Sequence, residues 1–183
     1  MRPTKQVQSV LEEASEAGLT SVAWGLESGN QRVLDLMQKG TNIQDIKDTL
    51  NLAKKFGIHN MTYTMFGFPS ETESEFMDTI NFLEDNSKNI DIISPSVFGL
   101  QHGSKIIKEA KIFGIASVEF EKRTYLSDKI SYSVNVGLSQ KQATKLFKEH
   151  KHQLQQINKI PNIISVFKEQ ILNYKVSNIP KLK

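Results

Sequence analysis

Three short apolar runs, separated by segments with helical periodicity, constrain the fold of this chain more than any other feature. The runs are residues 21–26 (SVAWGL), 61–68 (MTYTMFGF) and 90–100 (IDIISPSVFGL). They are short and largely apolar, and the second is rich in β-branched and aromatic residues, which is typical of strands buried on both faces. Helices alternating with such strands predict a parallel sheet with right-handed crossovers. The fold class is therefore α/β: a barrel, part of a barrel, or a doubly wound sheet.

The segments around these runs carry helix signals. Apolar residues at helical spacing predict helices over residues 7–17 and 33–37, and glycines follow both. Capping boxes predict two longer helices, and the pairs are Thr41 with Gln44, and either Ser70 with Glu73 or Thr72 with Glu75. Pro95, inside the third run, indicates a bulge or an edge strand.

The pattern changes after about residue 104. Residues 117–136 alternate loosely and predict a hairpin, and Ser139 with Gln142 caps a basic helix that runs to about Ile157. A last helix is expected over residues 162–174. We therefore expect two parts: residues 1–104, an incomplete barrel segment of about three parallel strands with helices, and residues 105–183, an α-rich C-terminal appendage.

Polar and glycine-rich motifs follow the predicted strands. They are GLESG (25–29), GFPSE (67–71) and FGLQHG (98–103). In parallel α/β folds the carboxyl ends of the strands meet at one edge, where ligands bind. Glu27 and Ser28 offer a carboxylate and a hydroxyl that suit an amine or a ribose diol, although a turn whose glutamate caps the next helix explains them equally well.

The second motif has two interpretations as well. Phe68 and Pro69, with Phe66, would form a flat apolar wall for a purine ring, and Gly67 would allow close approach of a ligand. Glu71 near a helix N-terminus is favoured by the helix dipole, so capping is the simpler explanation for the glutamate taken alone.

Composition narrows the function classes. The chain has no cysteine, which excludes disulfides and thiolate metal sites, and no metal site is predicted because His150 and His152 lie on different faces of a helix. Neither a signal peptide nor a membrane span is evident, so a cytoplasmic location is expected. Residues 1–100 carry a net charge of −6 and residues 101–183 carry +9. The basic part is more often a solvated helical face, and nucleic acid stays open as a partner without being indicated.

Taken together, the ordered motifs resemble the radical S-adenosylmethionine (radical SAM) superfamily. The stretches that carry the resemblance are GLESGNQRVLDLMQKGT, then KKFGI, then MFGFPSETESEFMDTINFL, then FGLQHGSKI. They cover about residues 5–115 and look like the second half of the family's partial (β/α)6 barrel. The sequence is most similar to iron–sulfur oxidoreductases with an N-terminal cobalamin-binding domain, and the methylthiotransferase branch has a similar GFPxET signature.

The resemblance implies roles for particular residues. Glu27 and Ser28 match positions that contact the ribose and methionyl portion of S-adenosylmethionine. Gly67, Phe68, Pro69 and Glu71 match the motif that lines the adenine pocket. Val97, Phe98 and Leu100 match the strand that holds the adenine edge. No catalytic residue is predicted.

One departure from the family is decisive. Its chemistry needs a 4Fe–4S cluster held by CxxxCxxC, and this chain has no cysteine. The cluster, and a cobalamin domain if there is one, would belong to a missing N-terminal part. We therefore expect a fragment that supplies part of the cofactor site and substrate cavity and is not catalytic alone. Its partner would be the missing half, in the same or a separate polypeptide. The alternatives are a non-catalytic binding or scaffold protein that uses its basic half on nucleic acid or an acidic partner, and an unrelated α/β enzyme with Glu27 and Glu71 as an acid–base pair.

Overall fold

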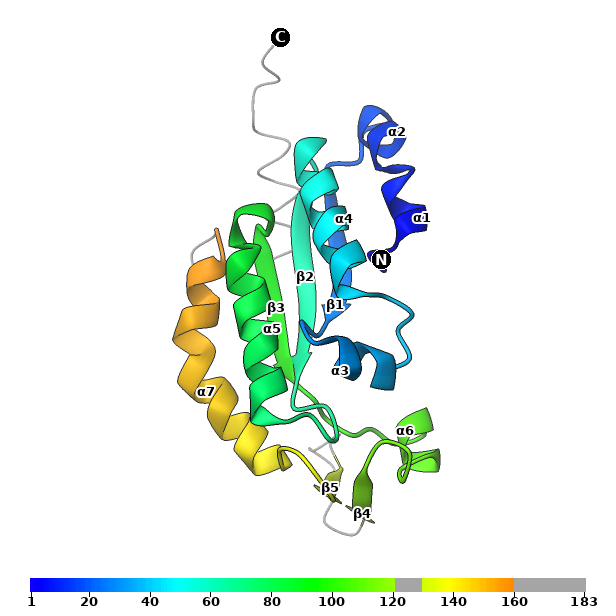
Figure 1. Ribbon diagram of the computed structural model, residues 1–183, viewed down its shortest axis with the longest axis vertical. Helices are drawn as coiled ribbons and strands as arrows, with labels where there is room; N and C mark the ends of the chain where they lie inside the picture. The colour runs from blue at the N-terminus through cyan, green and yellow to red at the C-terminus, as the bar shows by residue number, and fades with distance from the viewer. Residues whose placement is uncertain (121–129, 160–183) are drawn as a thin grey trace.

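The computed structural model describes residues 1–120 and 130–159 (Figure 1). The strands are β1 (Ser21–Glu27), β2 (His59–Phe66), β3 (Ile92–Val97), β4 (Ile115–Glu119) and β5 (Ser131–Val134). The helices are α1 (Lys5–Gln8), α2 (Leu11–Glu16), α3 (Gln31–Leu36), α4 (Ile43–Lys55), α5 (Glu73–Asp85), α6 (Lys105–Lys108) and α7 (Gln140–Ile157), with a 3-10 helix η1 (Ser87–Asn89). The helix predicted over residues 162–174 lies outside the described residues.

The main sheet has three strands in the order β1-β2-β3, and both pairings are parallel. The predicted α/β class with three parallel strands is therefore confirmed. Pro95 lies opposite Thr64 without a register shift, so it marks the edge strand β3 rather than a bulge. The register shift in the sheet lies instead between Gly25 and Glu27 of β1.

One face of this sheet carries the main hydrophobic core. Val22, Trp24 and Leu26 of β1 pack there with apolar residues of α4, α5 and α7. Figure 1 shows these three helices covering the same face of the sheet. On the opposite face, Ala23, Met61 and Ile92 form a small cluster that includes no helical residue among those described. Tyr63 on that face is 39% exposed.

Helix α7 is part of the main core. Its buried residues Ala143, Leu154 and Ile157 belong to the same cluster as the β1 side chains, so the core draws on residues from both sides of residue 104. The close approach is possible because residue 67 is a glycine with φ +73°, and a Cβ there would lie 2.5 Å from the Cβ of Ala143.

The predicted caps can now be compared with the structure. The pairs Thr72–Glu75 and Ser139–Gln142 both form complete capping boxes, at α5 and α7. The predicted pair Thr41–Gln44 is wrong, because the N-cap of α4 is Asn42, whose Oδ1 accepts from the Asp45 N–H at 2.8 Å. An asparagine caps at least as well as a threonine, so sequence pattern alone did not separate the two positions.

The N-terminal helix differs from the prediction, whereas the predicted hairpin is present. The N-terminal helix is broken into α1 and α2, with Ser9 and Val10 between them. The predicted hairpin is confirmed as the antiparallel pair β4–β5, whose connection at residues 121–129 is outside the described part. The hairpin covers a second hydrophobic cluster at the carboxyl ends of β2 and β3. No helix within residues 1–120 and 130–159 is long and apolar enough to cross a bilayer.

Candidate cofactor site

The carboxyl ends of β1, β2 and β3 form one edge of the sheet, called the carboxyl edge below. All nine residues predicted as cofactor contacts lie on these strand ends or in the loops that follow them. The structure gives them different environments, which are described strand by strand.

Glu27 ends β1 with an unusual backbone. Its φ is +69°, in the left-handed region that non-glycine residues rarely adopt. Its carboxylate forms an ion pair with Lys39, with 2.9 Å between Oε1 and Nζ. A Cβ on residue 25 would lie 2.9 Å from Glu27 Oε1, so Gly25 provides room for this carboxylate. Glu27 is thus a partly buried, charge-paired group at the carboxyl edge.

Ser28 faces the opposite way. Its side chain is fully buried, and Oγ lies 3.1 Å from Thr79 Oγ1 on α5 and accepts from the Asn30 N–H at 3.1 Å. The next residue is a glycine because a Cβ there would lie 2.7 Å from Thr79 Cα. Within the described residues, Ser28 therefore connects the loop after β1 to α5, and its hydroxyl has protein partners.

Glu71 is the most unusual ionisable group of the site. Its side chain is fully buried, one carboxylate oxygen accepts from the Gly67 N–H, and Oε1 is a buried atom with no hydrogen-bond partner among the described residues. Burial raises the pKa of Glu71 to about 7, against the lowering effect of the Gly67 N–H. Burial also raises the pKa of Tyr132 on β5, and the nearby Glu71 carboxylate adds to it.

Backbone contacts enclose Glu71 further. The Leu138 N–H donates to Glu71 O at 2.7 Å, and a Cβ on Gly137 would lie 2.6 Å from the same oxygen. The segment before α7 therefore lies directly on the loop after β2. Glu71 holds this loop together through Gly67, and it does not cap α5, whose capping box is formed by Thr72 and Glu75.

The predicted aromatic wall is present but covered. Phe68 is 3% exposed and packs edge-on against Phe98 (5.2 Å between ring centroids) and Phe113 (5.9 Å). Pro69 and Leu100 are buried as well, and Leu100 forms an isolated bridge with Ile130. Phe68 and Phe113 therefore belong to the core beneath the β4–β5 hairpin, whereas Phe98, which is 8% exposed, also lines the hollow beside this core.

A hollow of about 400 Å³ opens beside this aromatic core. The residues lining it, called the β3 hollow below, are Met65, Ser96, Val97, Phe98, Gly99, Gln101, Ser104 and Ile106. Of the nine predicted residues it includes Val97 and Phe98. Ser104 Oγ is buried and has no hydrogen-bond partner among the described residues. A mostly apolar wall with a few polar groups, one of them unpaired, suits an aromatic ligand with hydrogen-bonding edges.

Sequence reasoning missed Met65, Ser96 and Ser104. A usable signal was present, because alternation along a strand puts Met65 and Ser96, paired in register, on one face, while Phe66 and Val97 lie on the other. The sequence did not identify Ser96 and Ser104 as ligand contacts, because serine is common in the turns that follow strands and is therefore no specific sign of a ligand.

An ion pair that the sequence analysis did not single out, between Arg32 and Glu75, also stabilises the loops at the carboxyl edge. Arg32 on α3 forms a bidentate ion pair with Glu75 in the first turn of α5, and its guanidinium also donates to Ser70 O at 2.8 Å. The hydrogen bond from Arg32 lowers the pKa of Glu75 to about 2, and the same bond raises the pKa of Arg32. The Arg32–Glu75 ion pair and the hydrogen bond to Ser70 therefore connect α3, which follows the loop after β1, to the loop after β2 and the start of α5.

The residues present do not fit an iron–sulfur cluster, because the chain contains no cysteine. Among the described residues there is also no group of three or more histidine, aspartate or glutamate side chains that could hold a metal ion. The donors of the β3 hollow are hydroxyl and amide groups, which suit an organic ligand instead.

Comparison with known proteins tests the predicted family resemblance. Residues 1–83 match the family model described as the radical SAM superfamily, so the resemblance predicted from the sequence is confirmed for this part of the chain. An uncharacterized methyltransferase of Pyrococcus horikoshii is 36% identical over 85 residues, which are 46% of this chain and 18% of that protein. A putative methylthiotransferase of Methanocaldococcus jannaschii is 32% identical over 43% of this chain and 17% of its own length.

A tRNA-modifying relative is also similar. The threonylcarbamoyladenosine tRNA methylthiotransferase of Bacillus subtilis is 36% identical over 63 residues, 33% of this chain and 14% of that protein. The aligned segments therefore span less than a fifth of these relatives.

Solved structures support the fold over a longer stretch. The chain resembles coproporphyrinogen III oxidase from Escherichia coli, a radical SAM enzyme, with a TM-score of 0.58 at 18% identity, covering 86% of this chain and 31% of that one. It also resembles the cobalamin-dependent S-adenosylmethionine radical enzyme OxsB, with a TM-score of 0.59 at 12% identity, covering 93% and 30%. At these identities the likeness concerns the fold alone.

Proposed function

We propose that this chain supplies the strand β1–β3 portion of a radical SAM barrel and, with it, part of a binding site for S-adenosylmethionine. The observation that carries the proposal is the β3 hollow, which combines an apolar wall, Gln101 and the unpaired Ser104 hydroxyl at the carboxyl edge of a parallel sheet. The matched family and the solved structures make S-adenosylmethionine the natural candidate for the ligand.

The residues have separate tasks in this proposal. Met65 and Phe98 pack against the adenine ring and exclude water from it, while Ser104 donates to or accepts from a ring nitrogen or its amino group. Glu27, held by Lys39, presents a carboxylate at the same edge that suits the ligand's ammonium or ribose hydroxyls. Glu71 and the Arg32–Glu75 pair hold the loops in place and make no contact with the ligand.

Bound S-adenosylmethionine supplies a sulfonium group whose reductive cleavage needs an iron–sulfur cluster. This chain has no thiolates for one, so the cluster has to come from a further segment of the barrel, in the same polypeptide or another. Two features support such a partner. One face of the sheet has no helix over it within the described residues. Strand β1 lies at the edge of the sheet, where Ala23 O accepts from the Met1 ammonium (2.7 Å) and the Gly25 N–H donates to Met1 O (2.9 Å).

The test is a titration of the 15N-labelled chain with S-adenosylhomocysteine, followed by amide chemical shifts. We expect shifts confined to Glu27 and its neighbours in the chain, Met65 and residues 96–106, with an affinity in the millimolar range because part of the site is absent. Ser96→Trp fills the hollow and should abolish the shifts. Ser9→Trp, at an exposed serine of the segment between α1 and α2, is the matched control and should leave them unchanged. Shifts that persist in Ser96→Trp, or lie elsewhere, would refute the proposed site.

A further inference from the structure

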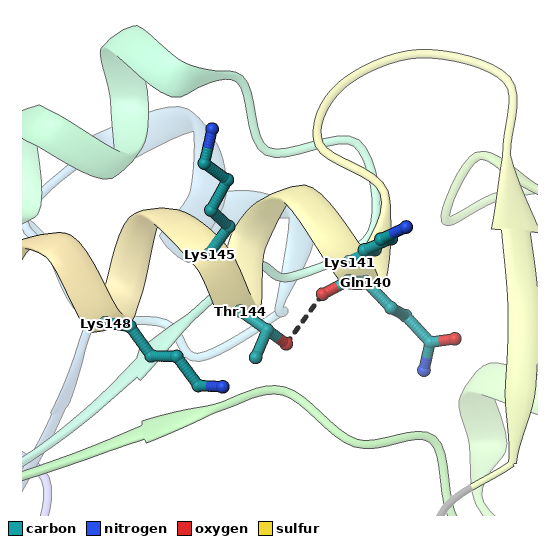
Figure 2. A pocket seen from close by; sticks show the side chains of 5 residues that line it. All are labelled: Gln140, Lys141, Thr144, Lys145 and Lys148. Atoms are coloured by element: carbon teal, nitrogen blue, oxygen red, sulfur yellow. Dashed lines mark hydrogen bonds between the residues drawn. The ribbon is translucent and has the colours of Figure 1, made fainter.

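A basic face on α7 is the feature of the structure that the proposed cofactor site does not use. Lys141, Lys145 and Lys148 follow the spacing i, i+4, i+7, which places them on one side of the helix, opposite the buried Ala143 and Leu154. Together with Gln140 and Thr144 they line a shallow depression of about 540 Å³ (Figure 2). The three lysines are called the basic face below.

The lysine charges of this face are poorly compensated. Lys145 has an exposed ion pair with Glu149 at 3.8 Å, whereas Lys141 and Lys148 have no carboxylate within ion-pair distance among the described residues. The neighbours of Lys141 and Lys148 at four residues' distance along α7 are Lys145, Thr144 and His152. Like charges at this spacing repel, so the arrangement does not serve the stability of the helix.

The position of Lys141 also does not serve the stability of α7. It lies in the first turn of α7, which contains no acidic residue, although the positive end of the helix dipole disfavours a cation there. By contrast, the first turn of α5 contains Glu73 and Glu75. The dipole and the three ammonium groups add to one positive potential at this end of α7, which is the end nearest the carboxyl edge, since Ala143 contacts Gly67.

The polar neighbours in the depression are used by the protein. Gln140 accepts from the Tyr132 N–H at 3.1 Å and donates to Ile130 O at 3.2 Å, so it anchors β5, and Thr144 Oγ1 donates to Gln140 O at 2.7 Å. Figure 2 shows this last bond and the lysine side chains extending from α7. A ligand of the depression therefore meets ammonium groups, which act as point charges without directional specificity.

From this chemistry we propose that the basic face binds the phosphate backbone of a nucleic acid, independently of the cofactor site. A protein partner fits less well, because the exposed positions of α7 carry no aromatic side chain or arginine, the residues that anchor protein interfaces. A membrane surface fits less well too, since Leu146 and Phe147 of α7 pack on the main core, so the basic side of this helix has no adjoining apolar stripe to insert. Backbone contacts alone give binding that is sequence-independent and sensitive to salt.

The experiment measures fluorescence anisotropy of a labelled single-stranded RNA of mixed sequence, and of DNA of the same sequence, with the full chain over a range of salt concentrations. The triple variant Lys141→Gln, Lys145→Gln, Lys148→Gln should bind RNA about tenfold or more weakly, and the slope of log K against log salt should fall by about 2, at ~0.7 per phosphate contact. The matched control is Lys47→Gln, Lys55→Gln, Lys88→Gln, three exposed lysines of other elements, and it should bind like the parent.

Two other outcomes would overturn the proposal. Equal losses in both triple variants would mean that overall charge, and not this face, governs binding. Binding of polyglutamate or of phosphatidylserine vesicles without binding of RNA or DNA would identify another class of partner. Stronger binding of RNA than of DNA, lost in the first triple variant, would support the proposal and specify RNA. Since S-adenosylhomocysteine is absent from this assay, its result does not depend on the cofactor site.

Discussion

Replacing Gly67 with alanine tests how α7 is attached to the sheet. The new Cβ would be placed 2.5 Å from Ala143 Cβ, and residue 67 would keep φ near +73°. The left-handed backbone alone costs about 1–2 kcal/mol for alanine. Relief of the clash requires α7 to move from the loop after β2, which adds about 1–3 kcal/mol, typical of overpacking in a core. We therefore expect Gly67→Ala to lower the free energy of unfolding by about 2–5 kcal/mol.

Gly40 provides a matched control. Its φ is +65°, close to that of Gly67, but a Cβ there would meet nothing within 4 Å. Gly40→Ala should therefore cost only the backbone term, about 1–2 kcal/mol. Any gain from stiffening the unfolded chain is common to both variants and cancels in the comparison. The difference between them measures the contact with α7.

Urea unfolding followed by tryptophan fluorescence is the assay. Trp24 is the sole tryptophan of the chain, is fully buried in the main core and donates to Asn60 Oδ1 at 2.7 Å, so it reports on global unfolding. The double variant Gly67→Ala, Ala143→Gly should recover about 1–2 kcal/mol relative to the sum of the two single changes, since it removes the clash. Equal costs for Gly67→Ala and Gly40→Ala, with no coupling to residue 143, would refute the packing argument.

Three further predictions concern buried polar groups. The pKa of Glu71 is about 7 in the fold and about 4.5 in the unfolded chain, so the folded state holds the proton more tightly and stability should fall by about 3 kcal/mol as pH rises from 4.5 to 7. Glu71→Gln should remove this pH dependence in urea titrations. An unchanged pH slope in the variant would contradict the assignment to Glu71. Thr62 has a buried hydroxyl with no partner among the described residues, so Thr62→Val should raise the melting temperature, with a gain in stability of about 1 kcal/mol. Thr79→Val loses hydrogen bonds to Ser28 and Gly29 and should lower the melting temperature. A change of the melting temperature in the same direction for both variants would count against the reasoning. Asp91→Ala should cost about 2 kcal/mol by calorimetry, because the buried Asn60 N–H loses its acceptor at 2.9 Å, and a cost near zero would show that solvent replaces the carboxylate.

The charge environment of Asp91 supports the last of these predictions. Burial by itself would raise the pKa of Asp91, but the Asn60 N–H, the Lys54 ammonium and Lys159 together hold it below its usual value. The Lys159 backbone N–H also donates to Asp91 O at 3.0 Å. Asp91 therefore fastens the residues after α7 to the amino end of β3, at the opposite end of the sheet from the candidate site.

The sequence by itself determined the elements whose signals are local. Apolar runs of strand length predicted β1, β2 and β3, and the pair Ser139–Gln142 predicted where α7 begins. For α5 the sequence left two pairs open, Ser70–Glu73 and Thr72–Glu75, and the structure has the second. The order of helices and strands then predicted the parallel sheet, because right-handed crossovers leave few other arrangements, and the edge at which a ligand site is expected. The failure at Asn42 shows the limit of such signals, since neighbouring residues can cap equally well.

Only the tertiary structure decided which residues at that edge are accessible. Ser28 and Glu71 are in motifs that suit a ligand, yet both side chains are buried. Thr79 contacts the Ser28 hydroxyl and Leu138 donates to the Glu71 backbone carbonyl, and both are more than 50 residues away in sequence. The β3 hollow and the unpaired Ser104 also depend on how distant elements pack. Local patterns report what a residue can do, whereas burial by segments far away in sequence decides which of those groups meet solvent or a ligand.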